Sequence, residues 1–177
     1  PYPWQMEFHN AGAFANERCL LAANQVGKSM AASVEGAIHL TGEYPQWWQG
    51  RRFDRPIKMW CGSESAETSR DISQLELLGP EGAYGSGWVP ESRLIGQPKY
   101  RQAGVADVVD IFYVRHKSGG ISSCSFKTYE QERRKWAGRR VHVIWLDEES
   151  SMEIYTEALT RTANTNGIVY LTFTPLL

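Results

Sequence analysis

The chain has 177 residues, of which 42% are hydrophobic, and this combination predicts one globular domain with a sizeable core rather than a disordered chain. Its 19 basic and 20 acidic residues give a net charge of −1, which excludes a globally basic nucleic-acid-binding protein, so any such contact must be local. Apolar runs are only a few residues long and no basic segment followed by an apolar one opens the chain, so we expect a soluble, cytoplasmic protein without membrane span or signal peptide.

The first element in chain order is a helix start, Tyr2-Pro3-Trp4-Gln5-Met6-Glu7-Phe8. The carboxamide of Gln5 can both donate to and accept from the edge of an adenine base, and an aromatic ring such as Phe8 can stack on its face. An ordinary amphipathic helix explains Phe8 equally well. We predict an adenine contact for Gln5 and leave Phe8 open between the base and the core.

The most informative segment is Leu20-Leu21-Ala22-Ala23-Asn24-Gln25-Val26-Gly27-Lys28-Ser29, which runs from strand-like residues into a Gly-Lys-Ser turn and then a helix. Backbone N–H groups of such a loop, with the positive end of the following helix, hold nucleotide phosphates. Lys28 adds a charge and Ser29 an oxygen for Mg²⁺. Ala22 replaces the usual first glycine, so the motif is degenerate. We predict nucleotide contacts from Ala23, Asn24, Gln25, Val26, Gly27, Lys28, Ser29 and Met30.

Apolar runs and helical patterns alternate along the chain, which indicates an α/β fold. We expect strands over residues 17–23, 57–62, 108–115, 121–128, 141–146 and 168–174, and helices over residues 29–40, 64–77, 130–136 and 151–163. Ser150 followed by Glu153 predicts a capping box before the last helix. Residues 108–128 are predicted to form a hairpin with its turn at 117–120, and residues 79–104 are predicted to form a long loop. The strand at 17–23 is expected to be buried like the others.

Two carboxylates, Asp147 and Glu148, follow the apolar run Val143-Ile144-Trp145-Leu146. At the end of a buried parallel strand beside a phosphate loop, such an aspartate organises the Mg²⁺ shell and such a glutamate polarises the attacking water. The alternative is that both are helix-start residues. Their coupling to Lys28 in one chain favours the nucleotide site.

Threonine hydroxyls close the last predicted strand, in Leu171-Thr172-Phe173-Thr174-Pro175. Thr172 and Thr174 can donate toward a γ-phosphate or the attacking water, so the strand could report whether phosphate is present. The alternative is a β-rich strand that ends at a proline.

Residues 127–140 carry six basic side chains against two acidic ones. Such a cluster can contact DNA phosphates, present an arginine to the nucleotide of a neighbouring subunit, or form a solvated helix face. Arg139 and Arg140 lead directly into the Asp147-Glu148 strand, so we expect at least one of them near the nucleotide.

Cysteines and histidines predict neither disulfides nor a metal site. Cys19, Cys61 and Cys124 are odd in number and each lies in an apolar run, which favours buried, reduced thiols. The four histidines show no ligand spacing.

Taken together, these motifs resemble the large terminase subunit of tailed bacteriophages, the ATPase that drives DNA into a prohead. The resemblance rests on the order and spacing of segments spanning nearly the whole chain, namely 3–5, 24–29, 126–131, 135–138, 143–149 and 172–175. It implies a P-loop NTPase of the ASCE or RecA-like class over residues 1–177, with a mainly parallel central sheet flanked by helices and an added β-hairpin. The cofactors it implies are ATP and Mg²⁺.

The resemblance also assigns roles to individual residues. Gln5 becomes the adenine-binding glutamine, Lys28 and Ser29 the phosphate and Mg²⁺ ligands, Asp147 the metal-shell aspartate, Glu148 the catalytic glutamate, and Thr172 to Thr174 the segment that couples hydrolysis to movement. Asn24 departs from the pattern, because some large terminases carry an arginine there. Arg139 or Arg140 of a neighbouring subunit is then expected to act on the nucleotide, with Arg161 as the next candidate.

The family has a C-terminal nuclease that these residues do not contain, so no nuclease activity is expected from this chain. Implied partners are double-stranded DNA, a portal protein that seats a homo-oligomeric ring, and a small terminase subunit, while the fragment alone should be a monomer in the host cytoplasm. A helicase-type motor and a nucleotide-binding scaffold without turnover remain as alternatives.

Overall fold

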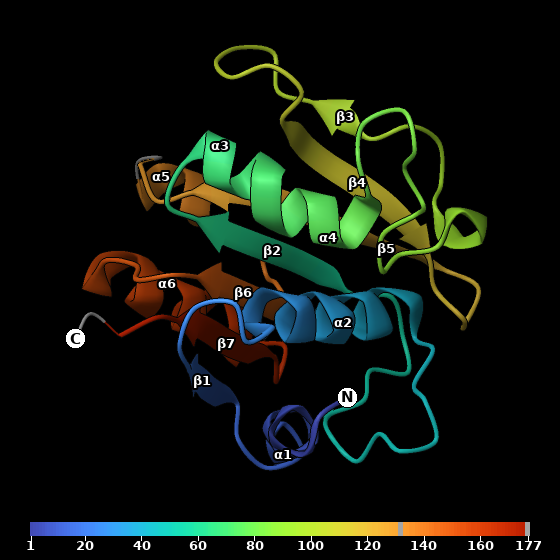
Figure 1. Cartoon of the computed structure of the whole chain (residues 1–177), viewed down its shortest axis with the longest axis vertical. Coiled ribbons are helices and arrows are strands. Elements are labelled where there is room, and N and C mark those ends of the chain that lie inside the picture. Colours follow the sequence, from blue (N-terminus) through green and yellow to red (C-terminus); the bar gives the residue numbers. More distant parts are fainter. Residues whose placement is uncertain (131–132, 176–177) are drawn as a thin grey trace.

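The computed structural model describes residues 1–130 and 133–175 and, for residues 133 and 134, the backbone alone. One seven-stranded sheet, in the order β1-β7-β6-β2-β5-β4-β3, runs through the molecule (Figure 1). Its strands are β1 Glu17–Leu21, β2 Lys58–Ser63, β3 Lys99–Tyr100, β4 Val109–Arg115, β5 Ile121–Thr128, β6 Val143–Asp147 and β7 Ile168–Phe173. Neighbours from β1 to β5 are parallel, and β4 and β3 continue the sheet antiparallel. This confirms the predicted α/β fold, with the hairpin built into the sheet.

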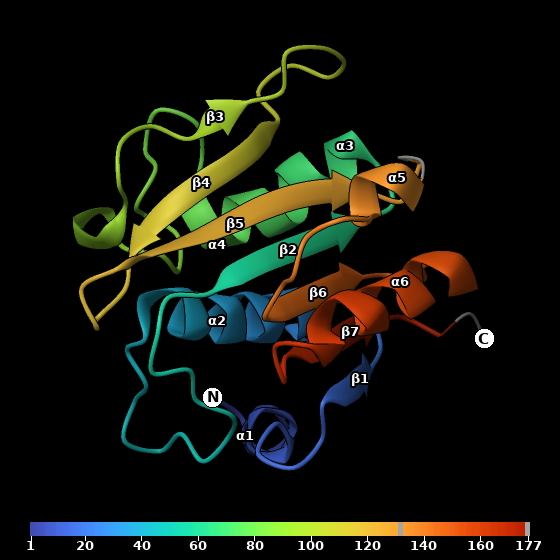
Figure 2. The same ribbon diagram turned by 180° about the vertical axis from the view of Figure 1, so that it is seen from behind.

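Helices cover both faces of the sheet, as the opposite views in Figures 1 and 2 show. The helices are α1 Pro3–Ala11, α2 Lys28–Thr41, α3 Ala66–Thr68, α4 Leu75–Leu78, α5 Arg133–Trp136 and α6 Met152–Ala163. One face carries α2, α3 and α4, the other carries α5 and α6, and α1 lies beside β1. No described helix is long and apolar enough to cross a membrane.

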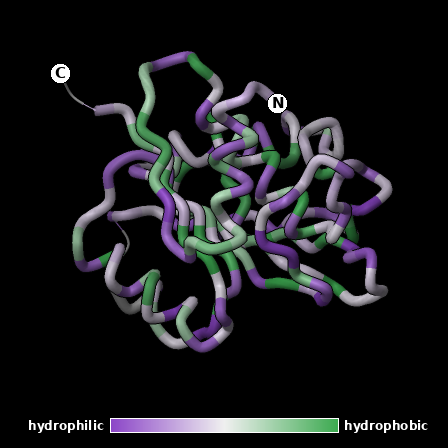
Figure 3. Tube along the Cα trace, turned by 90° about the horizontal axis from the view of Figure 1, so that it is seen from below, coloured by the Kyte–Doolittle hydropathy of each residue, from purple (hydrophilic) through white to green (hydrophobic). Residues whose placement is uncertain are grey.

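Strand β6 shows why the central strands are apolar throughout. Its side chains alternate between the two faces: Trp145 stacks on Tyr170 under α2, while Ile144 and Leu146 pack with residues of α5 and α6. All five β6 residues are buried. The hydropathy tube accordingly shows hydrophobic stretches along the strands at its centre (Figure 3).

The predicted helix over residues 64–77 is not a single α-helix. A π-helical segment, Ser69–Gln74, joins α3 to α4. The buried Gln74 carboxamide donates to the Asp107 carbonyl at 2.9 Å and accepts from the Val109 N–H at 2.8 Å, so this helix is fastened to the start of β4. Residues 79–104 likewise contain more than a loop, since a 3₁₀ turn, Glu91–Arg93, and strand β3 lie within them.

Two local predictions were wrong. Ser151, not Ser150, caps α6, because its hydroxyl accepts the Ile154 N–H at 3.4 Å. Strand β1 is an edge strand rather than a buried one, so Cys19 is exposed, whereas Cys61 and Cys124 are buried with their sulfurs 3.6 Å apart.

Candidate nucleotide site

The phosphate loop connects β1 to α2 at the carboxyl edge of the sheet. Gly27 precedes α2 with a φ of 90°, a left-handed conformation that glycine adopts without steric cost. No side chain caps the first turn of α2, so its N–H groups are free to hold an anion. The strand–loop–helix context predicted for this segment is therefore present.

Lys28 lies under this loop and is 7% exposed. Its ammonium donates to the carbonyls of Ala22 at 2.9 Å and Ala23 at 2.8 Å. An ammonium has three protons, so one donor remains for a phosphate oxygen. Val26 and Met30, in contrast, are exposed.

The carboxyl ends of β6 and β7 bring Asp147 beside the loop. Parallel register pairs Asp147 with Thr172 on β7 and Thr172 with Leu20 on β1, so three strand ends meet at one edge. The Thr172 hydroxyl donates to Asp147 Oδ1 at 2.6 Å and accepts from Trp145 Nε1 at 2.8 Å. Thr172 is fully buried and its hydroxyl holds the aspartate, while the phosphate contact suggested by the sequence stays a prediction.

Asp147 has the chemistry of a metal-shell ligand. It is 2% exposed, and burial raises its pKa to about 6 even though the bond from Thr172 favours the charged form. Among the described residues its buried Oδ2 has no hydrogen-bond partner, while Lys28 and the Ser29 hydroxyl also stabilise its charge. A buried carboxylate oxygen without a donor, near a serine hydroxyl, fits a Mg²⁺ ion that is bound by few protein ligands.

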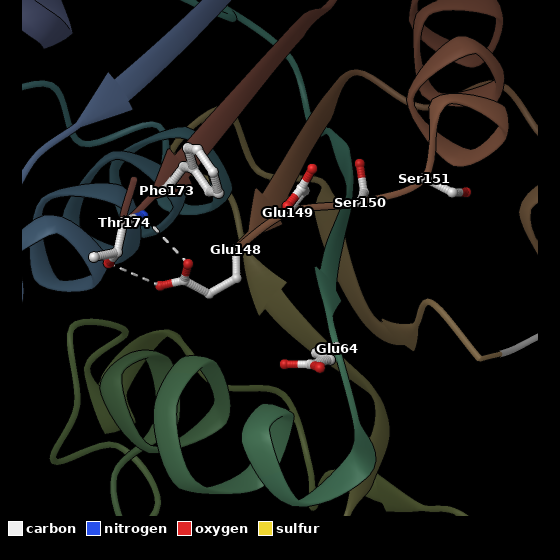
Figure 4. A pocket seen from close by; sticks show the side chains of 7 residues that line it. All are labelled: Glu64, Glu148, Glu149, Ser150, Ser151, Phe173 and Thr174. Atoms are coloured by element: carbon white, nitrogen blue, oxygen red, sulfur yellow. Dashed lines mark hydrogen bonds between the residues drawn. The ribbon is translucent and has the colours of Figure 1, made fainter. Parts of the chain in front are cut away.

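Glu148 is held in an unusual backbone conformation. Its φ is 62°, which is rare outside glycine, and its N–H donates to the Thr172 carbonyl at 2.8 Å. The Thr174 N–H donates to Oε2 at 3.2 Å and the Thr174 hydroxyl lies 3.3 Å from Oε1 (Figure 4). The carboxylate is thus aimed by the end of β7.

The Thr174 hydroxyl also joins Glu148 to the phosphate loop, because it lies 3.0 Å from Asn24 Oδ1. A hydroxyl has one proton, so Asn24 and Glu148 compete for it. The sequence marked Asn24 only as the place of a missing arginine, and this link was not predicted. It depends on the pairing of β1 with β7, which local sequence does not display.

A cavity of about 570 Å³ adjoins Glu148. Glu64, at the end of β2, faces it across the cavity from Glu148, and Glu149, Ser150, Ser151, Phe173 and Thr174 complete the lining (Figure 4). The cavity therefore brings the carboxylates of Glu64 and Glu149 to the surroundings of Glu148.

Gln5 lies beside the phosphate loop and is 5% exposed. Its Oε1 accepts the Tyr2 N–H at 2.8 Å, and a Cβ built on Gly27 would stand 3.5 Å from its Nε2. The carboxamide keeps one acceptor lone pair and its donors for a base. Phe8 belongs to the core, since it packs against Tyr170 and lies under the guanidinium of Arg18.

The basic residues Arg139 and Arg140 lie in the segment between α5 and β6. Arg139 and Arg140 are exposed, and the next residue, Val141, donates to the Arg161 carbonyl at the far end of α6. His142 then donates to the carbonyl of Lys58, where β2 begins. This is the amino edge of the sheet, opposite the phosphate loop, whereas Arg139 lies close enough to Lys127 of β5 to lower the pKa of that lysine. The expectation that Arg139 or Arg140 lies near the nucleotide stays a prediction. Arg161 lies at the amino edge and pairs with Glu157 at 2.6 Å.

Comparison with known proteins identifies a family whose model covers most of the chain. A family described as "Terminase large subunit, T4likevirus-type, N-terminal" matches residues 19–176. The chain is 39% identical over 199 positions to the terminase large subunit of Salmonella phage P22, covering 100% of this chain and 39% of that protein.

Two solved structures, both of the large terminase from one thermophilic bacteriophage, share the fold. The first is similar with a TM-score of 0.70 and 10% identity, over 99% of this chain and 39% of that one. The second holds the same terminase in complex with ADP and is similar with a TM-score of 0.59 and 10% identity, over 96% and 38%. The chain thus spans about two fifths of these relatives.

Proposed function

Because the chain belongs to the N-terminal family of terminase large subunits of the T4-like-virus type, we propose that it is a Mg²⁺-dependent ATPase and the motor domain of a DNA-packaging terminase. One observation carries the proposal: Lys28 at the start of α2 and the adjacent Asp147 and Glu148 at the end of β6 meet at one edge of the sheet. A phosphate loop, a metal-shell carboxylate and a water-activating carboxylate are the parts that ATP hydrolysis requires.

Ser29 and Asp147 would hold Mg²⁺, which when bound neutralises charge on the β- and γ-phosphates. Lys28 uses its remaining donor on a phosphate oxygen, and the N–H groups at the start of α2 hold the others. Thr172 keeps the Asp147 carboxylate in place.

Glu148 orients a water in line with the γ-phosphorus and accepts a proton from it. The water oxygen bonds to phosphorus while the bond from phosphorus to the β–γ bridging oxygen breaks, which gives ADP and phosphate. The strained backbone of Glu148 and its bonds from Thr174 fix the direction of the carboxylate. A charge-neutralising arginine would come from another subunit, with Arg139 and Arg140 as candidates, since both are exposed.

DNA has a candidate contact at the other end of the same sheet edge. A cavity of about 660 Å³ is lined by Lys99, Arg101, Lys127 and Lys135, with Asp110 as its one acidic lining residue among those described. Burial first, and then the charges of nearby arginines and lysines, lower the pKa of Lys127 to about 8. A phosphate backbone would relieve this repulsion, so the cavity suits a polyanion.

Hydrolysis is tested with Glu148→Gln, measured by phosphate release and by ATP binding. Glutamine keeps one acceptor oxygen for the Thr174 N–H but cannot take the proton, so turnover should fall by about 10²–10⁴ while ATP affinity stays within about twofold. Glu149→Gln is the matched control, because Glu149 lines the same cavity and is exposed. Equal turnover in the two variants would refute the role of Glu148, and ATP binding by wild type without phosphate release would favour a scaffold.

A further inference from the structure

A charged cluster is buried behind the phosphate loop, apart from the residues that meet the nucleotide. Its members are Arg18, Glu35, His9 and His39, of which Glu35 and His39 are fully buried and His9 is 1% exposed. Buried charges without a partner are costly, so such a cluster restricts the elements that carry it to one arrangement.

The cluster joins three elements. Arg18 of β1 forms a paired contact with the Glu35 carboxylate of α2, and its Nη1 also donates to the Phe8 carbonyl of α1 at 2.7 Å. His9 of α1 adds a second tie, with Nδ1 2.7 Å from Glu35 Oε2. His39 lies on α2 itself, with Nε2 3.4 Å from Glu35 Oε1 and Nδ1 3.0 Å from the Tyr44 hydroxyl, so its polar contacts join Glu35 to the loop after α2 rather than to α1.

Glu35 is the charged centre of these contacts. Burial alone would raise its pKa, but the guanidinium of Arg18 and the hydrogen bonds from His39, His9 and Arg18 hold the pKa well below its usual range. The carboxylate therefore stays ionised at neutral pH and keeps its contacts with α1 and β1.

The elements fixed in this way are those that bring Gln5 to the loop. Gln5 precedes His9 by one helical turn, so both lie on one face of α1. Gln5 Nε2 faces Gly27 at the start of α2, two turns before Glu35 on the same helix. Helix α1 thus links Gln5 to His9, the contact between His9 and Glu35 links α1 to α2, and α2 leads back to Gly27, which Gln5 faces.

We propose that the Arg18–Glu35–His9 cluster is a positioning device that sets Gln5 against the phosphate loop and thereby selects adenine nucleotides. This inference rests on the proposed function, since it requires that the chain binds ATP. Arg18, Glu35 and His9 touch no nucleotide and act through Gln5.

The experiment compares His9→Leu with the matched control His39→Leu, using ATP, GTP and inorganic tripolyphosphate as ligands of the full chain. Both variants remove a buried histidine from Glu35, but only His9→Leu releases α1. We expect His9→Leu to weaken ATP binding about tenfold, the equivalent of one hydrogen bond, with tripolyphosphate binding within about twofold. His39→Leu should leave the preference for ATP over GTP unchanged.

Gln5→Ala completes the test, because together with His9→Leu it forms a double-mutant cycle. If His9 acts through Gln5, His9→Leu should have little effect on ATP affinity once Gln5 is alanine. Additive losses, or a parallel loss of tripolyphosphate binding, would overturn the inference while leaving the ATPase proposal intact. Arg18→Lys, which keeps the charge but cannot hold Glu35 and Phe8 together, serves if His9→Leu does not fold. A wild-type chain that binds no ATP would overturn both proposals.

Discussion

At the scale of single residues, Asp147 is placed where its charge opposes folding. The folded-state pKa of about 6 lies above the value near 4 of an unfolded aspartate. Between about pH 4 and pH 6 the folded chain holds more protons, so the free energy of unfolding falls as the pH rises through that window and stays lower above it. The ionised group then costs about 3 kcal/mol at neutral pH.

Asp147→Asn should therefore stabilise the chain by about 2–3 kcal/mol at pH 7, because asparagine keeps the shape and the acceptor for Thr172 but carries no charge. Urea unfolding at pH 7 and below pH 4 measures the effect, which should vanish at the lower pH. Asp54→Asn, at an exposed site, is the control. If the variant is no more stable than wild type at pH 7, burial of the ionised Asp147 does not lower the free energy of unfolding.

Single residues also show how much of the site can be predicted from the sequence. Lys28 and Asp147 lie at the expected ends of their elements, because a Gly-Lys-Ser turn and an apolar strand ending in carboxylates are local patterns. The partners of Thr172 and Asn24 were missed, since both depend on which strands pair side by side. His9 and His39 show no ligand spacing, yet α1 and α2 bring both to Glu35.

At the scale of elements, the residue that the sequence pattern predicts as the N-cap of α6 differs from the residue that caps the helix. Ser150 matches the capping box, but the hydroxyl of Ser151 accepts the Ile154 N–H, and the buried hydroxyl of Ser150 has no partner in the described part of the chain. Ser151→Ala should cost about 0.5–1 kcal/mol, at the low end for a cap because the bond is long. Ser150→Ala should cost less, and thermal unfolding of both variants decides which serine caps the helix.

The predicted and observed positions of helices and strands agree best where burial sets the hydrophobic pattern of the sequence. Strands β6 and β7 formed within or at the edges of the predicted runs because both faces of the sheet must be apolar under helices. In β5 buried residues alternate with more exposed ones, and its place followed from the predicted hairpin. The reasoning from burial misplaced β1, whose apolar residues do not reveal that it lies at the edge, and it missed the π-helical segment, which depends on contacts with β4.

At the scale of the whole molecule, charge is divided along one edge of the sheet. Carboxylates gather around the cavity beside Glu148, and cations around the cavity beside β3 and β5. A chain with a net charge of −1 can bind DNA only through such a local patch.

Lys99→Ala combined with Lys135→Ala should weaken binding to duplex DNA and reduce the slope of log affinity against log salt by about 2, because each phosphate contact contributes about 0.9. Arg115→Ala with Lys117→Ala removes the same charge from the opposite end of the β4–β5 hairpin, and both of these residues are exposed. Fluorescence anisotropy across a salt series gives the two slopes. If both double variants shift the slope equally, net charge alone governs DNA binding, and the cavity beside β3 is not its site.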